Sequence, residues 1–173
     1  EIGSGLVGSE MCIRDRDHAV VDRLDLHRYM GTWYEIARFD HRFERRLSEV
    51  TATYTLMPDG TVRVENRGCK HKKPYDVCKT AEGRAKIPDP SQPGKLKVSF
   101  FLSFYSDYYV LELDQDEYNY ALIGSSSDKY LWILSRAPIL PEEIKKKLLD
   151  AATRRGYDVK KLIWVEQREK KIM

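Results

Sequence analysis

The chain has 173 residues, 42% of them hydrophobic and 33% charged, with a formal net charge of +3. This length predicts one domain, or one domain with a tail, and no apolar run approaches the ~18 residues that a membrane-spanning helix needs. The mixed charges describe a hydrated surface, which excludes the strongly basic stripe typical of nucleic-acid-binding proteins.

The first segment, residues 1–16, has neither the basic start nor the apolar core of a secretory signal. It resembles the translated remnant of a sequencing adapter, so we expect it to be non-native or disordered. Any natural targeting segment is then expected outside this sequence. We predict one domain over residues 17–167, followed by a charged, solvated tail over residues 168–173.

Alternating apolar and polar residues, broken by turn signals, predict a series of β-strands. A short lead-in at residues 22–30, with one turn of 3₁₀ helix, comes before them. The expected strands are residues 32–39, 50–57, 61–67, 79–87, 95–102, 108–113, 118–124 and 129–136. The fourth strand carries small residues on one face, which would leave room inside a closed sheet.

The last predicted strands are apolar on both faces, so they need a cover on their outer side. Apolar residues at helical spacing supply it after Pro141, which we place at the first helical position, and Gly156 is expected to cap the end. A short final strand is expected at residues 161–166. The fold class predicted is all-β: an eight-stranded antiparallel up-and-down β-barrel with one C-terminal α-helix packed outside.

Two cysteines outside the first segment, Cys69 and Cys78, stand nine positions apart. This spacing fits a disulfide across the foot of a hairpin, in an oxidising compartment, and it fits two free thiols equally well. A zinc site is not expected, because His71 is the one histidine nearby and no second Cys-x-x-Cys pair is present. We expect neither a metal nor a cofactor.

Three stretches resemble the motifs of a known family. GTWYE at residues 31–35 resembles the first lipocalin motif, G-x-W, and LSRAP at 134–138 resembles the third, R-x-P. DEY at 116–118 resembles the second, T-D-Y, without its threonine. With eight strands and a following helix, these motifs identify residues 22–167 as similar to lipocalins, above all to the bacterial outer-membrane lipocalins and apolipoprotein D.

The resemblance implies that the tryptophan and arginine of these motifs pack together at the closed end of the barrel. Here they are Trp33 and Arg136, and an arginine over an indole makes a cation–π contact. Gly31, Trp33, Tyr118 and Arg136 are therefore expected to be structural and not catalytic.

The ligand would lie inside the barrel, along the inward-facing side chains. If Arg136 points inward, the period of two directs Trp132 inward as well, and apolar strand faces supply further candidates. The resemblance adds an aromatic beyond the fifth strand and one beside the loop over the mouth. The expected ligand-binding residues are Tyr54, Val98, Phe100, Tyr105, Trp132 and Phe39. Plain packing in a filled barrel is the alternative for each.

Four arginines surround the first long loop, at positions 38, 42, 45 and 46. They predict a positive rim above an apolar cavity, which suits a ligand with an acidic head and a hydrocarbon tail. A solvated loop is the alternative interpretation.

The leading hypothesis is a non-enzymatic carrier or store for a fatty acid or lysophospholipid, linked to membrane lipid maintenance or stress. The alternatives are a lipocalin-scaffold enzyme acting on a lipid and a lipocalin that binds proteins through its loops; no Ser-His-Asp set is legible. The resemblance implies a periplasmic, secreted or outer-membrane-anchored protein, attached through a lipidated N-terminus outside this sequence. We expect a monomer or homodimer without a nucleic-acid partner.

Overall fold

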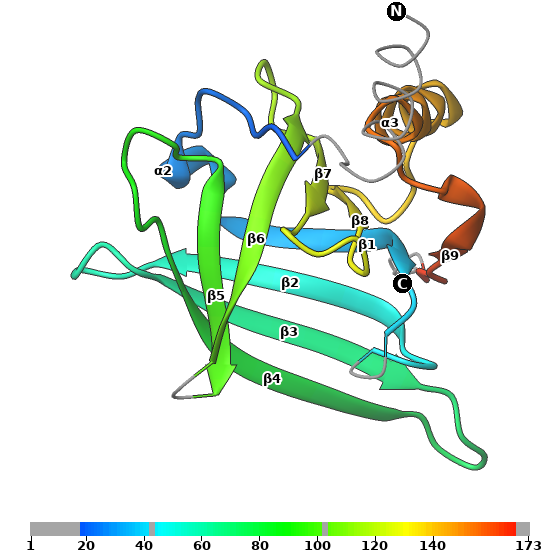
Figure 1. The fold of residues 1–173 in the computed structure, drawn as a ribbon. Coiled ribbons are helices and arrows are strands. Elements are labelled where there is room, and N and C mark those ends of the chain that lie inside the picture. Colours follow the sequence, from blue (N-terminus) through cyan, green and yellow to red (C-terminus); the bar gives the residue numbers. More distant parts are fainter. Residues whose placement is uncertain (1–17, 42–43, 102–103, 169–173) are drawn as a thin grey trace, which may run out of the picture.

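The computed structural model describes residues 18–41, 44–101 and 104–168 (Figure 1). Predictions for residues 1–16, for Arg42 and for the tail beyond Arg168 therefore lie outside the described residues. Within the described part of the chain, no helix is long and apolar enough to cross a membrane.

Eight antiparallel strands form the barrel, in the order of the sequence. They are β1 (Gly31–Phe39), β2 (Ser48–Leu56), β3 (Val62–Lys70), β4 (Val77–Lys86), β5 (Lys95–Phe101), β6 (Phe104–Leu113), β7 (Tyr120–Gly124) and β8 (Trp132–Ser135). β8 pairs with β1, and β1 pairs with β2, so the sheet closes on itself. A short β9 (Leu162–Trp164) pairs with the end of β1. The predicted up-and-down barrel is confirmed.

The helices differ from the predictions in detail. The lead-in holds a turn of α-helix, α2 (Leu26–Tyr29), where we expected a 3₁₀ turn, and Asp25 caps it by accepting from the His27 N–H. Pro141 is the N-cap of α3 (Glu142–Arg154), one position before the expected one. Gly156 ends this helix as predicted, because its φ of +92° suits glycine and its N–H donates to the Thr153 carbonyl. A 3₁₀ turn, η1 (Val159–Lys161), leads into β9.

The apolar residues form two cores, one inside the barrel and one outside. Trp33, Tyr54 and Leu134 belong to the inner core. The outer core lies between α3 and the outward faces of the late strands, as expected for strands that are apolar on both sides (Figure 1). The two ends of the barrel also differ: α2 lies at one end, the closed end, and the β1–β2 and β3–β4 connections lie at the other, which we call the mouth.

A bulge in β1 decides which of its side chains face inward. Glu35 pairs with Leu134, but the next pair is Ala37 with Ile133, so the register shifts by one residue. Ile36 and Ala37 both enter the outer core, and the parity of the rest of the strand is reversed. Phe39, predicted to contact the ligand, therefore packs outside the barrel.

Candidate ligand-binding site

The three motif stretches meet at the closed end. The Arg136 guanidinium carbon lies 3.9 Å from the centroid of the fully buried Trp33 ring, and its nitrogens donate to the carbonyls of Tyr118, Thr32 and Arg28. Gly31 allows this approach, because a Cβ there would lie 3.3 Å from Arg136 Nη1 and the residue has a φ of +97°. The arginine thus closes one end of the barrel with charge-assisted hydrogen bonds.

Tyr118 ties the second motif to the same place. Its hydroxyl accepts from the Asp25 N–H at 3.0 Å, and the Arg28 guanidinium lies 4.3 Å from its ring centroid. Tyr118 has a φ of +55°, which explains why β7 begins at Tyr120 and not at the expected residue 118. These contacts hold α2 across the closed end.

Three tyrosines, of which Tyr29 and Tyr54 are buried and Tyr108 is partly buried, fill the interior next to this closure. The Tyr108 hydroxyl lies 2.5 Å from that of Tyr29 and 2.9 Å from that of Tyr54, and burial raises the pKa of all three. The cavity between them and Val98 measures about 10 Å³, enough for one water. Tyr54 and Val98 do face inward, as predicted, but they form a packed floor.

Phe100 and Trp132 lie nearer the mouth. The Phe100 side chain rests on the inner face of β4, since a Cβ on Gly83 would come within 2.7 Å of its Cδ1 atom, and it is 37% exposed. The Trp132 ring is partly buried against the inner core and stacks on Tyr130, with 5.6 Å between centroids. Both aromatics keep part of their surface exposed.

Tyr105 does not join them. Ser106 pairs with the inward-facing Val98, so Ser106 also faces inward. Its neighbour Tyr105 therefore faces outward, because successive side chains on a strand point to opposite faces. The Lys86 ammonium lies 4.3 Å from the centroid of its ring. The prediction that Tyr105 lines the ligand site therefore fails on strand parity.

A buried polar cluster occupies the wall below the mouth. Arg38 Nη1 donates to Glu35 Oε1 at 3.3 Å, and both side chains are almost completely buried. Glu44, from the β1–β2 connection, accepts from the Trp132 indole N–H at 3.0 Å and bonds His41 Nε2 at 2.7 Å. Sequence reasoning missed this cluster, although the period of two from Trp33 would have directed Glu35 inward.

The pKa values of Glu35 and Glu44 shift in opposite directions. Burial raises the pKa of Glu35 well above its ordinary value, and the Glu44 carboxylate raises it further. Burial also pushes the pKa of Glu44 upward, but hydrogen bonds from Glu35 and His41 outweigh that effect and lower it to about 2. Glu35 is therefore the protonated member, and Glu44 keeps its charge beside Trp132.

Arg38 connects this cluster to the loop over the mouth. Its Nη2 donates to the carbonyls of Glu44 at 2.7 Å and Leu47 at 3.1 Å, which holds the β1–β2 connection in place. Arg38 therefore does not belong to a positive rim, and Arg45 lies 3.8 Å from the Asp40 carboxylate. The predicted basic mouth is weaker than the sequence indicated.

The opposite wall of the mouth is uncovered. Pairing through Trp33, Ala52, Asn66 and Ala81 places all four on the inner face. β4 pairs with β5 through residues 84–86, and its residues 77–82 are exposed although the strand lies within the sheet. The barrel is thus packed at its closed end and open beside β4.

The disulfide lies at the rim of this open wall. Cys69 and Cys78 face each other on β3 and β4 and form the bond, with 4.0 Å between their Cα atoms. Of the two alternatives that the spacing allowed, the structure has the disulfide.

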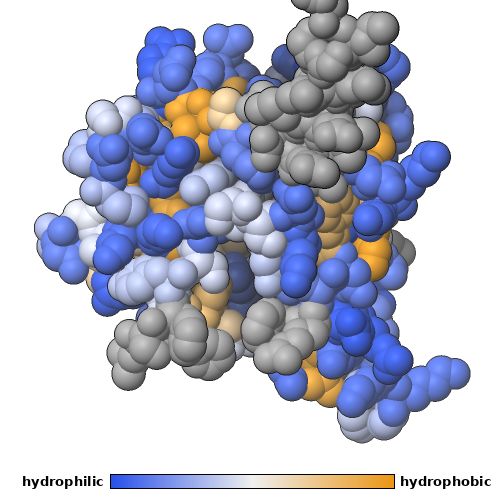
Figure 2. All heavy atoms as spheres, viewed as in Figure 1, coloured by the Kyte–Doolittle hydropathy of each residue, from blue (hydrophilic) through white to orange (hydrophobic). Residues whose placement is uncertain are grey.

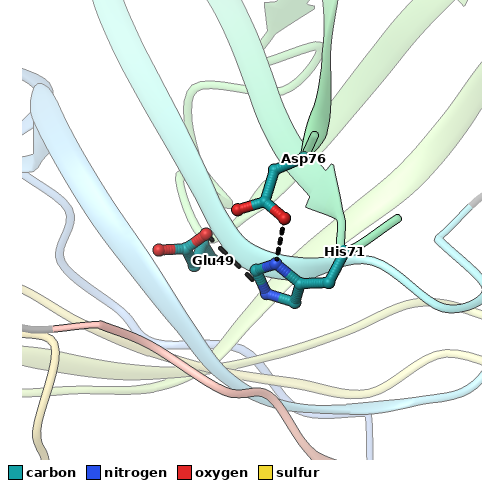
Figure 3. A group of neighbouring side chains, drawn as sticks. All are labelled: Glu49, His71 and Asp76. Carbon is teal, nitrogen blue, oxygen red and sulfur yellow. Dashed lines mark ion pairs between the residues drawn. The ribbon is translucent and has the colours of Figure 1, made fainter. Parts of the chain in front are cut away.

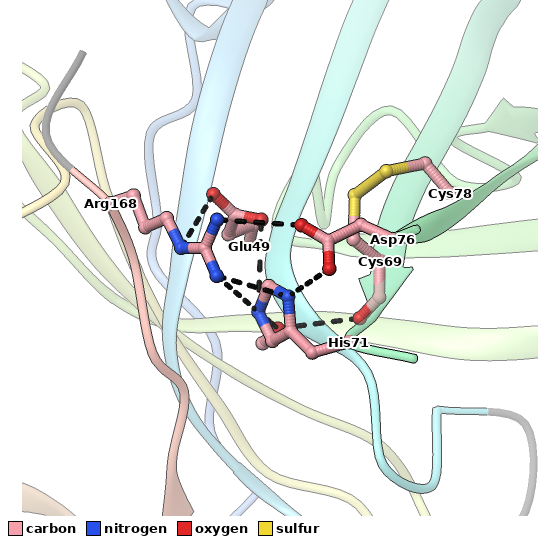
Figure 4. The surroundings of a disulfide bond; sticks show 7 residues. Glu49, Cys69, His71, Asp76, Cys78 and Arg168 are labelled. Carbon is pink, nitrogen blue, oxygen red and sulfur yellow. Dashed lines mark hydrogen bonds and ion pairs between the residues drawn. A yellow bond between two sulfur atoms is a disulfide. The ribbon is translucent and has the colours of Figure 1, made fainter. Parts of the chain in front are cut away.

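Next to the disulfide lies the one cluster, among the described residues, that offers three possible metal ligands. Glu49, His71 and Asp76 each present a ligand atom, all within 4.8 Å of one another (Figure 3). A nitrogen and two carboxylates would suit a divalent cation such as zinc. However, the Arg168 guanidinium already pairs with both carboxylates, 3.4 Å from Asp76 and 3.9 Å from Glu49 (Figure 4).

The same cluster contains a hydroxyl, an imidazole and a carboxylate in contact. Ser48 Oγ lies 2.8 Å from His71 Nε2, and His71 Nδ1 lies 2.9 Å from Asp76. The sequence did not show this set, which β2 and β3 bring together. Ser48 pairs with Cys69, whose parity is opposite to that of inward-facing Val64, so the set points away from the barrel. It serves as an ion-pair cluster that fastens the chain near Arg168.

Comparison with known proteins agrees with this architecture. A family model described as a lipocalin-like domain matches residues 24–167. The chain is 49% identical over 152 residues to outer membrane lipoprotein Blc of Escherichia coli (strain K12), covering 88% of this chain and 84% of that protein. It is 34% identical over 156 residues to apolipoprotein D of Mus musculus, covering 86% and 79%.

Solved structures share the fold at lower identity. Insecticyanin from the tobacco hornworm Manduca sexta superposes with a TM-score of 0.70 at 24% identity, covering 90% of this chain and 87% of that one. A likeness at this level of identity describes the fold alone.

Proposed function

The chain belongs to the lipocalin family, and from this premise we propose that it carries or stores one small hydrophobic ligand in the mouth-side half of its barrel. The observation that carries the proposal is the exposed stretch of β4 at residues 77–82. The exposed Phe100 lies beside it on the neighbouring strand β5, and the partly buried Trp132 lies on β8. Burial of an acyl chain against such surfaces contributes about 0.8 kcal/mol per methylene.

The ligand would be a lysophospholipid or a fatty acid. The charges at the mouth favour the lysophospholipid, since Glu44 keeps a buried carboxylate beside Trp132 and would repel a second carboxylate. In a zwitterionic head group, the cation could pair with the Glu44 carboxylate. The phosphate could pair with exposed arginines such as Arg45 and Arg46. The floor formed by Tyr54 and Val98 would limit how deeply the chain enters.

This role is that of a binding protein and not of an enzyme. The disulfide fits an oxidising compartment, so we place the protein in the periplasm, at the outer membrane or outside the cell. The relatives named as outer membrane lipoproteins support the same location. A role in membrane lipid maintenance or stress would follow from that location.

Titration with a lysophospholipid, followed by tryptophan fluorescence, tests the proposal. Because the chain has three tryptophans, Trp132→Phe is needed to assign the signal to the mouth. Phe100→Ala should lower the affinity about fivefold, because part of the ring's burial against the ligand is lost. Tyr105→Ala, the same kind of truncation on the outer face, is the matched control and should leave the affinity unchanged.

A fatty acid of equal chain length should bind more weakly than the lysophospholipid. Binding that is equally sensitive to Phe100→Ala and Tyr105→Ala would mean that the ligand does not occupy the inner face. Absence of binding for every chain length would leave the loops as the functional surface.

A further inference from the structure

The connection between β3 and β4 is an exposed and basic part of the described chain. We call residues 70–79 the hairpin tip; it holds four lysines and one aspartate, at positions 70, 72, 73, 79 and 76. With His71 neutral, its formal charge is +3, equal to that of the whole chain. The tip projects beyond the body of the barrel (Figure 1), and most of the side chains visible at that corner are hydrophilic (Figure 2).

The one acidic side chain of the tip is already neutralised. Asp76 lies 2.9 Å from His71 and 3.4 Å from Arg168, and hydrogen bonding from His71 lowers its pKa. Within the described residues, by contrast, no ion pair includes any lysine of the tip. In the described part of the chain, the exposed lysines at positions 72, 73 and 79 and the partly exposed Lys70 therefore have no acidic partner.

Two apolar side chains stand among these lysines. Tyr75 is 79% exposed and Val77 is 44% exposed. A tyrosine has an apolar ring and a polar hydroxyl, a combination enriched where a membrane meets water. Lysines around such a ring would add attraction to anionic head groups, because a polybasic segment and apolar contacts act together at a bilayer surface.

The tip is also held in a fixed position. The Cys69–Cys78 disulfide closes its base, and the ion pairs of Asp76 and Glu49 with Arg168 fasten it to the chain that follows β9. Because the strands run up and down, the β3–β4 connection lies at the same end of the barrel as the β1–β2 connection. A surface that binds the tip would therefore lie beside the mouth.

We propose that the hairpin tip is a docking element for an anionic phospholipid bilayer, with Lys72 and Lys73 contacting head groups and Tyr75 entering the interface. Docking in this way brings the open side of the barrel to the membrane, where a lipid ligand enters and leaves. The tip lies outside the barrel interior, so membrane docking and ligand binding are separate properties of the chain.

Co-sedimentation with vesicles of phosphatidylcholine, with or without phosphatidylglycerol, tests the proposal on the whole chain. The protein should bind the vesicles that contain phosphatidylglycerol, lose this binding in high salt, and bind phosphatidylcholine alone weakly. The double variant Lys72→Gln/Lys73→Gln should bind roughly 25-fold more weakly, about fivefold for each lysine. Tyr75→Ser should also weaken binding, with no change in melting temperature.

The matched control is Lys146→Gln/Lys160→Gln, which removes the same charge from α3 and η1. An equal loss in this control would overturn the docking role of the tip and assign binding to net charge. If the protein binds soluble heparin as strongly as it binds the anionic vesicles, and Tyr75→Ser has no effect, the tip binds polyanions in general. That result would overturn the proposal of a bilayer as its partner. Titration of Lys72→Gln/Lys73→Gln with lysophospholipid should give the wild-type affinity. Failure of the docking proposal can therefore be distinguished from failure of the ligand-binding proposal.

Discussion

The two ends of this barrel are built from similar residue types but differ in how completely they are packed. At the closed end, Trp33 is fully buried, Arg136 donates three hydrogen bonds to carbonyls, and three tyrosine hydroxyls bond one another. At the mouth, residues 77–82 of β4 are exposed. The comparison indicates that stability is concentrated at the closed end, and that the mouth is the part able to accept a ligand.

The largest effect is expected from the closed end. Trp33→Ala should lower the free energy of unfolding by about 3–5 kcal/mol, because it leaves a cavity in a packed site and removes the partner of Arg136. Trp132→Phe also replaces a tryptophan, but at the mouth, and it should lower the free energy of unfolding much less. Urea unfolding of the two variants measures the difference. If Trp132→Phe is as destabilising as Trp33→Ala, the two ends do not differ in the way described.

The disulfide should contribute the next largest amount. Replacing both cysteines, Cys69→Ser/Cys78→Ser, should lower the free energy of unfolding by about 2–3 kcal/mol, given the short loop that the bond closes. Reduction of the wild type should reproduce this loss, and the double variant should not respond to reductant. A response of the double variant would show that the effect of reductant arises elsewhere.

The carboxyl pair at the mouth predicts a pH dependence of known sign. The pKa of Glu35 is raised in the folded state, so its contribution to stability is fully present below about 4.5 and is lost as pH rises through the raised pKa. Glu35→Gln holds the neutral form, so stability should fall less steeply with pH in this variant than in the wild type. The difference in slope should not exceed about 1.4 kcal/mol per pH unit.

Thermal or urea unfolding of both proteins between pH 4.5 and 8 gives the two slopes. Parallel curves for wild type and Glu35→Gln would mean that Glu35 is ionised in the folded protein. A steeper fall in Glu35→Gln would contradict the assignment of the proton to Glu35.

Alternation along the sequence predicted the strands, and apolar residues at helical spacing predicted the helix, because both depend on local spacing. The closed barrel was inferred from eight strands joined by short loops. Alternation also gave the inward direction of Trp132, Val98 and Tyr54. It failed at Phe39, because a bulge between Glu35 and Ala37 reverses the parity of β1, and a bulge has no marker in an alternating apolar strand. Tyr105 was misplaced because the resemblance, and not strand parity, had suggested it.

The polar cluster at the mouth could be predicted in part. The position of Glu35 two residues after Trp33 indicates an inward carboxylate. Glu44 and His41 come from a loop, and their position depends on the hydrogen bond between Glu44 and Trp132, which is 88 residues away in the sequence. Such long-range pairing leaves no pattern in the sequence. The disulfide could be predicted only as one of two alternatives, because the spacing of Cys69 and Cys78 allows the bond without requiring it.

The most direct test of the division between a packed floor and an open mouth is the affinity for lysophospholipids of increasing chain length. In the wild type, affinity should rise by up to about 0.8 kcal/mol per methylene and then stop rising when the chain reaches Tyr54. In Tyr54→Ala, the rise should continue to longer chains, because the floor is removed. If the affinity of the wild type keeps rising to the longest chains, and Tyr54→Ala does not change the profile, the ligand does not meet this floor and the account is wrong.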